Sequence, residues 1–390
     1  MSHPRRTGGR ALAILLMAAV WIASGVGVYL YFGAHRTTLA LQARKPTEVK
    51  PKTGPIAHLP GTLYLVQGGT LYRLQRGNFT PVLNTPGGAS VWTQPAFKPD
   101  GQGLVVVRRD YGSSDLFQVD SSGHVLNQLT HNASRTVETN HWAFYPRLSA
   151  DGSVLFFSYD RKDPVNLYNV VLSVYSMPAG GPFGQAKKWT VPAAYTGGDV
   201  QPIPLASGSV IYTKYSFDNK TNRILSQIYL TPRAGAPGRA LTTIEDDCSQ
   251  AAISPDGRRL AMICTDGKQV ASLEIAQFDG SNLGPPQVLV SGQLAAQPTW
   301  SPDGSSLVYL APHGSGGHFQ LWQVPAPPAS SVSPEPSPTK GSQTARATPR
   351  PTPTPAPTPT PTPTSSAPPQ PIELTSDLDF DATSTIAWHA

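Results

Sequence analysis

The chain has 390 residues, including 41 Pro and 35 Gly, and a formal net charge of +6 at pH 7. This composition is typical of short strands separated by turns, and it excludes a mainly helical protein. The basic excess lies in residues 1–60, which carry eight Lys and Arg against one Glu. Because the rest of the chain has no broad positive surface for phosphates, we expect no nucleic-acid binding.

Residues 11–32 (ALAILLMAAVWIASGVGVYLYF) contain no charged side chain. A helix rises about 1.5 Å per residue, so this segment is long enough to span a hydrocarbon core of about 30 Å. The aromatic residues at its end suit the membrane interface and favour a retained anchor over the alternative, a cleaved signal peptide. The sequence thus predicts a cytoplasmic tail at 1–10, a single transmembrane helix at 11–32 and a basic stalk linker at 33–60.

The remainder of the chain is expected outside the cytoplasm, on a single-pass protein of the cell membrane in a bacterial envelope. Long domains cross a membrane largely regardless of the flanking charge. The two cysteines of the chain also suit an oxidising compartment.

Internal repeats are the strongest signal in the sequence. Six segments share a short strand, a tight turn and a second apolar strand. They are QPAFKPDG (94–101), YPRLSADG (145–152), QPIPLASG (201–208), QAAISPDG (250–257), QPTWSPDG (297–304) and DLDFDATS (377–384). In a Pro-Asp-Gly turn, Pro fixes φ, Asp closes the turn through its side chain and Gly takes the left-handed conformation. Each copy therefore predicts a β-hairpin.

A third and a fourth strand-like run follow most copies, and the fourth often ends in Leu-Thr. The first five turns recur 47 to 56 residues apart, which suits blades of four strands. We therefore predict an all-β fold, a β-propeller of about six blades at 61–325 completed by C-terminal strands at 371–390. The Pro/Thr-rich segment at 326–370 is expected to be a disordered loop inserted in the last blade, with an inter-domain linker as the alternative.

The ends of the repeat pattern predict how the ring closes. Residues 62–66 (TLYLV), 70–75 (TLYRLQ) and 79–84 (FTPVLN) have the pattern of strands two to four of a blade, and 377–381 (DLDFD) is expected to supply its first strand. Sharing one blade between the two chain ends removes free strand edges. Residues 385–388 (TIAW) compete with 62–66 for the second place, and the sequence leaves that choice open.

The copies QAAISPDGRRLAMI and QPTWSPDGSSLVYL resemble the Pro-Asp-Gly repeat of TolB-like six-bladed propellers, bacterial periplasmic relatives of the WD-repeat folds. The resemblance covers about residues 61–325 and 371–389. It implies the propeller architecture but says little about function, because the repeat recurs in scaffolds and in enzymes. We expect no room for the α/β domain that precedes the propeller in TolB, and the expected anchor is retained, so the resemblance does not by itself imply the role of TolB in an envelope translocation complex.

Catalytic and metal-binding patterns are absent from the sequence. No Ser has Gly at both −2 and +2, which excludes serine hydrolases of the propeller type. The nine His show no metal-ligand spacing, and His131 and His141 are expected on solvated loops. The acidic residues of 245–247 and 377–381 are expected to be solvated rather than to form a site. We therefore predict no catalytic residue, no metal site and no cofactor.

The two cysteines are expected to face each other. If the fourth hairpin turns on Pro255-Asp256-Gly257, Cys248 lies opposite Cys264, with Cα atoms about 4.4–6.8 Å apart. A cross-strand disulfide would close a loop of about 15 residues and stabilise the fold by about 3 kcal/mol in the chain-entropy model. Two unpaired buried thiols remain the alternative.

Binding is the expected function. The leading hypothesis is a membrane-anchored, non-catalytic scaffold that holds an envelope protein, a peptide or a glycan on its loops and in its central channel. The alternative is a propeller enzyme or sensor with a small-molecule or glycan site in the channel, which would bring His and carboxylates to one channel mouth. A third hypothesis is a structural, wall-associated protein whose Pro/Thr-rich segment makes the contact.

Overall fold

The computed structural model describes residues 55–162, 169–265, 270–314, 316–328 and 370–390. The predicted tail at 1–10, the transmembrane helix at 11–32, most of the stalk at 33–60 and most of the segment at 326–370 lie outside these residues. Within the described ranges, no helix has the length and apolar character that crossing a membrane requires. The anchor, the stalk and the disordered segment therefore stay predictions.

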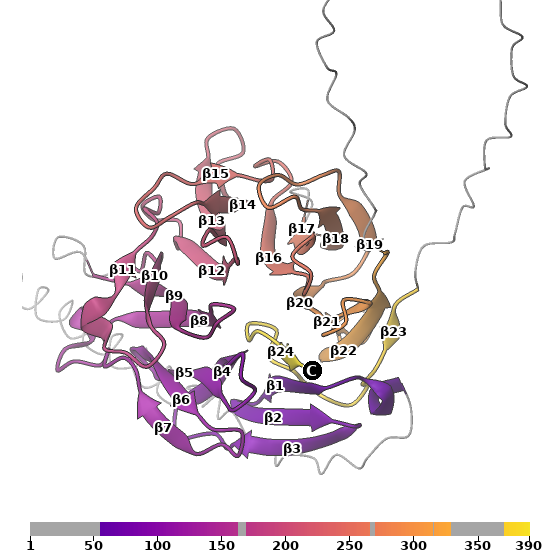
Figure 1. The fold of residues 1–390 in the computed structure, drawn as a ribbon, viewed down its shortest axis with the longest axis horizontal. Helices are drawn as coiled ribbons and strands as arrows, with labels where there is room; N and C mark the ends of the chain where they lie inside the picture. Colours follow the sequence, from indigo (N-terminus) through magenta and orange to yellow (C-terminus); the bar gives the residue numbers. More distant parts are fainter. Residues whose placement is uncertain (1–54, 163–168, 266–269, 315, 329–369) are drawn as a thin grey trace, which may run out of the picture. The chain divides into compact units, whose positions relative to one another are not determined.

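The described residues form six four-stranded antiparallel sheets, arranged as blades around a central axis (Figure 1). The predicted all-β, six-bladed propeller is therefore confirmed. Each blade is numbered here in chain order, and its strands are given from the innermost to the outermost.

Blade 1 contains β4 (Val91–Phe97), β5 (Leu104–Arg109), β6 (Ser114–Val119) and β7 (Val125–Gln128); blade 2 contains β8 (Trp142–Leu148), β9 (Val154–Asp160), β10 (Ser173–Pro178) and β11 (Lys187–Lys188); blade 3 contains β12 (Asp199–Pro204), β13 (Val210–Asp218), β14 (Arg223–Thr231) and β15 (Arg239–Ala240). Blade 4 contains β16 (Cys248–Ile253), β17 (Arg259–Cys264), β18 (Ser272–Gln277) and β19 (Gln287–Val290); blade 5 contains β20 (Ala296–Trp300), β21 (Ser306–Pro312), β22 (Phe319–Pro325) and β23 (Ile372–Glu373); blade 6 contains β24 (Ala387–His389), β1 (Thr62–Gln67), β2 (Thr70–Gln75) and β3 (Asn78–Leu83). The short 3-10 helices are η1 (Pro55–His58), η2 (Val137–Thr139) and η3 (Phe183–Gln185).

Blade 6 joins the two ends of the propeller, as expected. The strand β24 pairs with β1 through Thr62 and His389, Leu63 and Trp388, and Tyr64 and Ala387. The predicted first strand at 377–381 is wrong, because the segment 385–388 leads into the innermost strand instead. The hydroxyl of Ser384 accepts the N–H of Gln94 in blade 1 at 2.8 Å, which places the residues after it, rather than 377–381, along the free edge of β1. Residues 377–381 belong to the connection before β24 and reach β1 only through the isolated bridge of Phe380 with Gln67.

The turns between the first and second strands have the expected chemistry. Their glycines have φ between 69° and 83° and are Gly101, Gly152, Gly208, Gly257 and Gly304. In four of these turns, a carboxylate accepts the backbone N–H two residues on, at 2.9 to 3.2 Å. Hydrogen bonds from the hydroxyls of Ser149 and Ser153 lower the pKa of Asp151 to about 2. Each turn is therefore fixed by atoms a few residues apart, which is why the sequence revealed it.

The Leu-Thr endings of the blades also have a structural role. The outermost strands of five blades have only two to four residues, so the backbone ladder there is short. In four of these blades a Thr hydroxyl accepts the N–H of a third-strand residue at 2.9 to 3.0 Å, through Thr130, Thr190, Thr242 and Thr375. The residue before each Thr donates its own N–H to the same third-strand residue at 2.7 to 2.8 Å. The Thr side chain thus extends the pairing beyond the short strand.

Hydrophobic side chains fill the space between neighbouring blades. One buried cluster joins blades 4 and 5 and includes Ile263, Leu273, Trp300 and Tyr309. The indole N–H of Trp300 donates to the carbonyl of Ala252 in the preceding blade at 2.9 Å. Burial of this kind contributes about 25 cal/mol per Å² of apolar surface, so the blades stabilise one another.

Antiparallel strand order gives the ring two distinct faces. The turn face carries the connections between the third and fourth strands of each blade and, in blades 1 to 5, those between the first and second strands. The loop face carries the connections between second and third strands and those that lead to the next blade. The chain enters β1 and ends after β24 on the turn face. Residues 326–371 connect β22 to β23 there, within one sheet, which is the arrangement of an inserted loop.

Candidate functional site

The innermost strands of blades 1 to 5 surround the central axis, and each carries a β-bulge at the same place (Figure 1). The bulged residues have left-handed φ values of 50° to 56°, although none is Gly; they are Gln94, Tyr145, Gln201, Gln250 and Gln297. This conformation is unfavourable for a residue with a side chain and persists where other contacts hold it. Four of the five are followed by Pro, which a bulge tolerates because the ladder needs no N–H there.

Hydrogen bonds between neighbouring blades hold the bulges in place. The backbone N–H of Tyr145 donates to Oε1 of Gln94 at 2.7 Å, and that of Gln250 donates to Oε1 of Gln201 at 3.2 Å. The N–H of Gln297 donates to Oε1 of Gln250 at 2.6 Å. Each side-chain oxygen thus accepts the N–H that the bulge in the next blade leaves outside the ladder. We call these five residues, with Ser384, the glutamine belt.

Blade 6 completes the belt without a glutamine. The hydroxyl of Ser384 accepts the N–H of Gln94 at 2.8 Å, and Nε2 of Gln297 donates to the carbonyl of Ala382 at 3.1 Å. Ser384 and Thr385 therefore take the place of the Gln-Pro pair of the other copies. The sixth copy therefore begins at Ser384, and the first strand predicted at 377–381 lies too early in the chain.

Tyr145 interrupts the belt between blades 2 and 3. Its phenol stands where the other copies have an amide, and within the described ranges no hydrogen bond joins it to the bulge of Gln201. Burial, with Coulombic contributions from Tyr215 and Asp381, raises the pKa of Tyr145 to about 12, while a hydrogen bond with Gln94 opposes the shift. The phenol is therefore neutral at physiological pH.

A cavity of about 20 Å³ lies in the channel next to this interruption. Its wall is made of Tyr145, Arg147, Gln201, Ile203, Gln250, Ala251, Gln297, Pro298, Thr299 and Thr385. Arg147 is the one charged side chain in this wall, which contains neither His nor a carboxylate. No hydrogen bond or ion pair joins Arg147 to another described residue, and burial lowers the pKa of its guanidinium. The cavity is thus a polar, positively charged hollow.

Exposed apolar side chains gather on the loop face. Nine large apolar residues with high exposure lie on its connections or at the strand ends beside them; they are Tyr111, Val137, Val170, Val191, Tyr195, Phe217, Ile224, Val270 and Leu294. The other four described residues of this kind lie at the starts of outermost strands, beside connections of the turn face: Val125, Leu126, Val288 and Ile372. The loop face thus carries nine of the thirteen. An exposed apolar surface of this kind is typical of a protein-interaction face.

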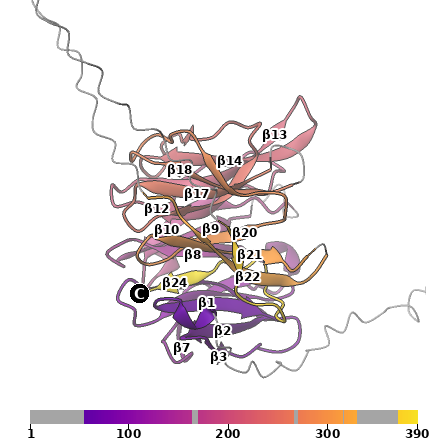
Figure 2. The ribbon, with the colours of Figure 1, turned by 90° about the vertical axis from the view of Figure 1, so that its right-hand side faces the viewer.

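One hairpin on the loop face differs from the others in length. The strands β13 and β14 each have nine residues, whereas the second and third strands of the other blades have six or seven. Figure 2 shows this hairpin projecting past the rest of its blade. Near its tip, Phe217 pairs with Ile224 across the two strands, and they are 50% and 47% exposed. The hairpin therefore presents an apolar pair to solvent.

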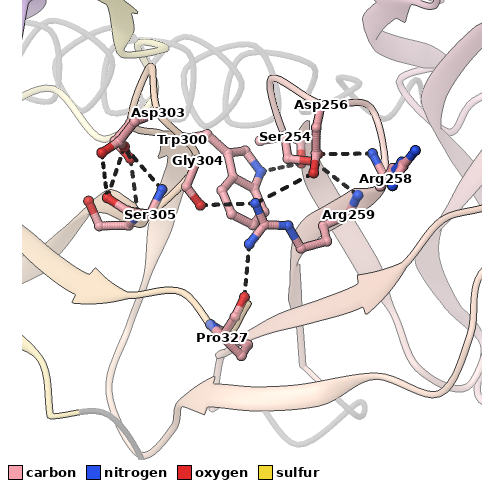
Figure 3. Close-up of polar contacts among 12 residues, drawn as sticks. Ser254, Asp256, Arg258, Arg259, Trp300, Asp303, Gly304, Ser305 and Pro327 are labelled. Atoms are coloured by element: carbon pink, nitrogen blue, oxygen red, sulfur yellow. Dashed lines mark hydrogen bonds and ion pairs between the residues drawn. The ribbon is translucent and has the colours of Figure 1, made fainter. Parts of the chain in front are cut away.

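On the turn face, polar side chains form hydrogen bonds between neighbouring blades, and Arg259 is an example (Figure 3). Its guanidinium donates to the carbonyl of Gly304 at 2.9 Å and to that of Pro327 at 2.8 Å. It also lies 4.6 Å from the ring centroid of Trp300, within the range of a cation–π contact. Arg259 thus ties blade 4 to blade 5 beside the start of the segment 326–371.

The structure joins Cys248 and Cys264 by a disulfide, with the Cα atoms 4.1 Å apart, slightly closer than expected. They are also direct partners in the ladder of β16 and β17. Nearer the turn, Ala252 pairs with Ala261, one position away from the register that the sequence suggested. The bulge at Gln250 absorbs one residue and restores the register at the cysteines. The bond closes the loop-face end of a hairpin whose other end is the Pro-Asp-Gly turn.

The histidines discussed above have different surroundings. His131 is exposed, as expected. His141 lies on the loop before β8, as expected, but it is half-buried, because its Nδ1 lies 2.9 Å from the carbonyl oxygen of Asp160 and its ring packs on Tyr159 at 5.5 Å. Its role is to connect the start of blade 2 to its second strand.

The acidic segments are partly solvated, as expected, because Glu245, Asp377 and Asp379 are exposed, but other acidic residues in them hold local structure. Asp247 accepts hydrogen bonds from Ser226 at 2.8 Å and from Thr265 at 2.7 Å, which links blade 3 to blade 4. Asp379 pairs with His318 at 3.1 Å, and Asp381 accepts the N–H of Thr383 at 2.9 Å. Within the described ranges, no group of three or more His, Cys, Asp or Glu could hold a metal ion.

Sequence reasoning missed the glutamine belt and Arg147. A signal for the belt was present, because Gln precedes the hairpin in four of the six copies and Tyr145 stands in its place in a fifth. The pattern was interpreted only as the start of a strand. No comparable signal marks Arg147, since its importance depends on what the other blades place around it.

No family model matches this sequence, and no curated protein sequence matches it either. Among solved structures, TolB from Acinetobacter baumannii superposes with a TM-score of 0.52 at 18% identity, over 68% of this chain and 61% of TolB. This chain therefore matches less than two thirds of the length of that protein.

Two further structures are more distant. A putative TolB from Agrobacterium tumefaciens gives a TM-score of 0.48 at 15% identity, over 68% of this chain and 85% of that protein. A gluconolactonase from Xanthomonas campestris gives 0.42 at 12% identity, over 70% and 84%. At these identities the similarity to Acinetobacter TolB shows the fold alone, and the described part of this chain has a TolB-like six-bladed propeller fold.

Proposed function

We propose that this protein is a membrane-anchored, extracytoplasmic scaffold that binds an envelope protein through the loop face of its propeller, without catalysis. The anchor is proposed from residues 11–32, and the location from the anchor and from the disulfide, which forms and persists in oxidising compartments. The chain enters β1 on the turn face, which is opposite the loop face.

The enrichment of exposed apolar residues on the loop face, which carries nine of the thirteen described, supports this proposal. Loops on a rigid scaffold commonly carry recognition. The apolar pair of Phe217 and Ile224 on the long hairpin is the most prominent element of that face. Aromatic and aliphatic side chains of this kind are the usual anchors of a protein interface.

The test compares two double variants of the full-length chain in cross-linked envelope preparations. Phe217→Ser with Ile224→Ser removes the apolar pair of the hairpin. Val125→Ser with Leu126→Ser is the matched control, since these residues are 49% and 58% exposed on the outermost strand of blade 1. We expect a cross-linked partner with the wild type and the control but not with the hairpin variant. An unchanged set of cross-links in the hairpin variant would contradict the proposed docking face.

A propeller enzyme or sensor with its site in the channel is the second candidate. One observation favours it, the charged cavity at Arg147. Catalysis would predict reproducible turnover of an esterase, lactonase, glycosidase or peptidase substrate that Arg147→Met abolishes. A sensor would instead bind its ligand in the channel without turnover and would change the binding of the partner at the loop face.

A further inference from the structure

Two partly or fully buried arginines of this propeller have opposite surroundings. Arg259 donates to two carbonyl oxygens and lies against an aromatic ring. Arg147 lines the channel cavity and has no acceptor among the described residues. Arg147 is half-buried, and its guanidinium carries five N–H donors and no acceptor, so an anion is the partner that it suits. Arg147 is therefore a channel-lining cation without an anionic partner among the described residues.

Neighbouring glutamines add further donors to the same wall. The side-chain oxygens of Gln201 and Gln250 are fixed toward backbone N–H groups of the next blade, which can only donate. Their amide NH2 groups are consequently left without an acceptor in the described part of the chain, beside Arg147. Gln297 has the opposite orientation, because its Nε2 donates to a carbonyl, and it leaves one oxygen free. The wall thus offers one positive charge and several N–H donors, against the free oxygen of Gln297 and the hydroxyl oxygens of Tyr145, Thr299 and Thr385.

The size of the cavity limits what can enter. About 20 Å³ holds one or two water molecules or a functional group of similar size, whereas pockets for whole drug-sized ligands have about 300–1,000 Å³. Inorganic phosphate, with a tetrahedral array of four oxygens, is bulkier than a planar carboxylate. A carboxylate also matches the fork of a guanidinium with two parallel hydrogen bonds.

We propose that the channel of this propeller is a receptor for a single carboxylate group, held by Arg147 and the amide NH2 groups of Gln201 and Gln250. The carboxylate is carried by a peptide chain or by a small organic acid, and the cavity recognises the group rather than the molecule. This inference does not depend on the proposed docking face, because it rests on different residues.

Binding is tested on the full-length chain in detergent micelles, by saturation-transfer NMR at low salt. The probes are acetate, N-acetylalanylalanine, the C-terminal amide of that dipeptide, and inorganic phosphate. We expect both carboxylates to bind, the amide to fail and phosphate to bind more weakly than acetate. Stronger binding of acetate than of the dipeptide would indicate a small acid, and the reverse order a peptide terminus. Equal binding of the dipeptide and its amide, or a preference for phosphate, would overturn the proposal.

Arg147→Met gives a second and independent readout. The variant should weaken carboxylate binding about tenfold or more, since a charge-assisted, bidentate contact is lost. Its melting temperature without ligand should stay equal or rise, because an uncompensated charge is replaced by an apolar side chain of similar length. The control Arg233→Met alters an exposed arginine of the turn face and should change neither quantity.

A structural role for Arg147 gives the opposite result. If its charge compensates a group outside the described residues, Arg147→Met lowers the melting temperature, and the carboxylate proposal fails. Arg147→Lys keeps the charge but not the fork, so it should retain folding and lose part of the affinity. Loss of carboxylate binding with normal cross-linking at the loop face would leave the proposed function intact, and the two hypotheses are thereby distinguished.

Discussion

The two faces of the propeller use the same strands in different ways. On the turn face, the five connections between first and second strands are short and turned on left-handed glycines, four of them are closed by an Asp side chain, and an arginine ties one blade to the next. The connections of the loop face vary in length and expose apolar side chains. The difference suggests that repetition fixes the scaffold on one face, while variation on the other is free to serve recognition.

A variant that opens the ring should lose more stability than any other, because both faces depend on ring closure. Removing residues 385–390 deletes β24, exposes an edge of β1 and takes away the buried Ile386 and Ala387. We expect a loss on the order of 5 kcal/mol in the free energy of unfolding, or about 10–20 °C in the melting temperature of a domain of this size. Differential scanning calorimetry measures it. Deleting 329–369 is the control and should change the melt little; equal melts for the two deletions would refute closure by β24.

Loss of the disulfide should cause the second-largest loss of stability, because the bond fixes the loop-face end of a hairpin. Cys248→Ala with Cys264→Ala should cost about 3 kcal/mol in the chain-entropy model for a loop of this length. Chemical denaturation with and without reductant gives the value for the wild type, and the double variant should no longer respond to reductant. Mass spectrometry that finds both thiols free in protein taken from the envelope would contradict the bond.

The glutamine belt lies between the faces and should contribute less. Gln250→Leu removes the acceptor for the backbone N–H of Gln297, and an unpaired buried donor costs about 1–3 kcal/mol. Urea denaturation should show this loss. Tyr145→Leu is the matched control at the interruption of the belt, where no N–H of the next blade depends on the side chain, so it tests the hydrogen bond separately from the loss of packing. Equal losses in the two variants would mean that the belt adds nothing beyond packing.

Two variants with the smallest expected effects on stability should distinguish the role of the turn face from that of the loop face. Gly257→Ala forces a side chain into a φ of 70° on the turn face and should cost about 1–2 kcal/mol without affecting partner binding. Phe217→Ser with Ile224→Ser on the loop face should change stability by about 0.5 kcal/mol or less while abolishing binding. Thermal melts and cross-linking yields on the same samples provide both numbers. A hairpin variant that melts far below the wild type would show that the loop face is structural as well.

Local chemistry is what the sequence alone determined. A turn such as Pro255-Asp256-Gly257 is specified by atoms within about three residues of each other, so its repetition predicted the hairpins, the blades and the partner of Cys248. The alternation of apolar runs likewise predicted that both chain ends share one blade.

Only the tertiary structure decided which strand closes the ring and what lines the channel. Residues 377–381 and 385–388 both have strand-like patterns, and the choice depended on the free edge of β1, which is more than 300 positions away in the chain. Gln250 and Arg147 acquire their roles in the same way, because the groups beside them come from other blades. A side chain's sequence neighbours fix its conformation, but its partners across the channel are fixed by the closure of the whole ring.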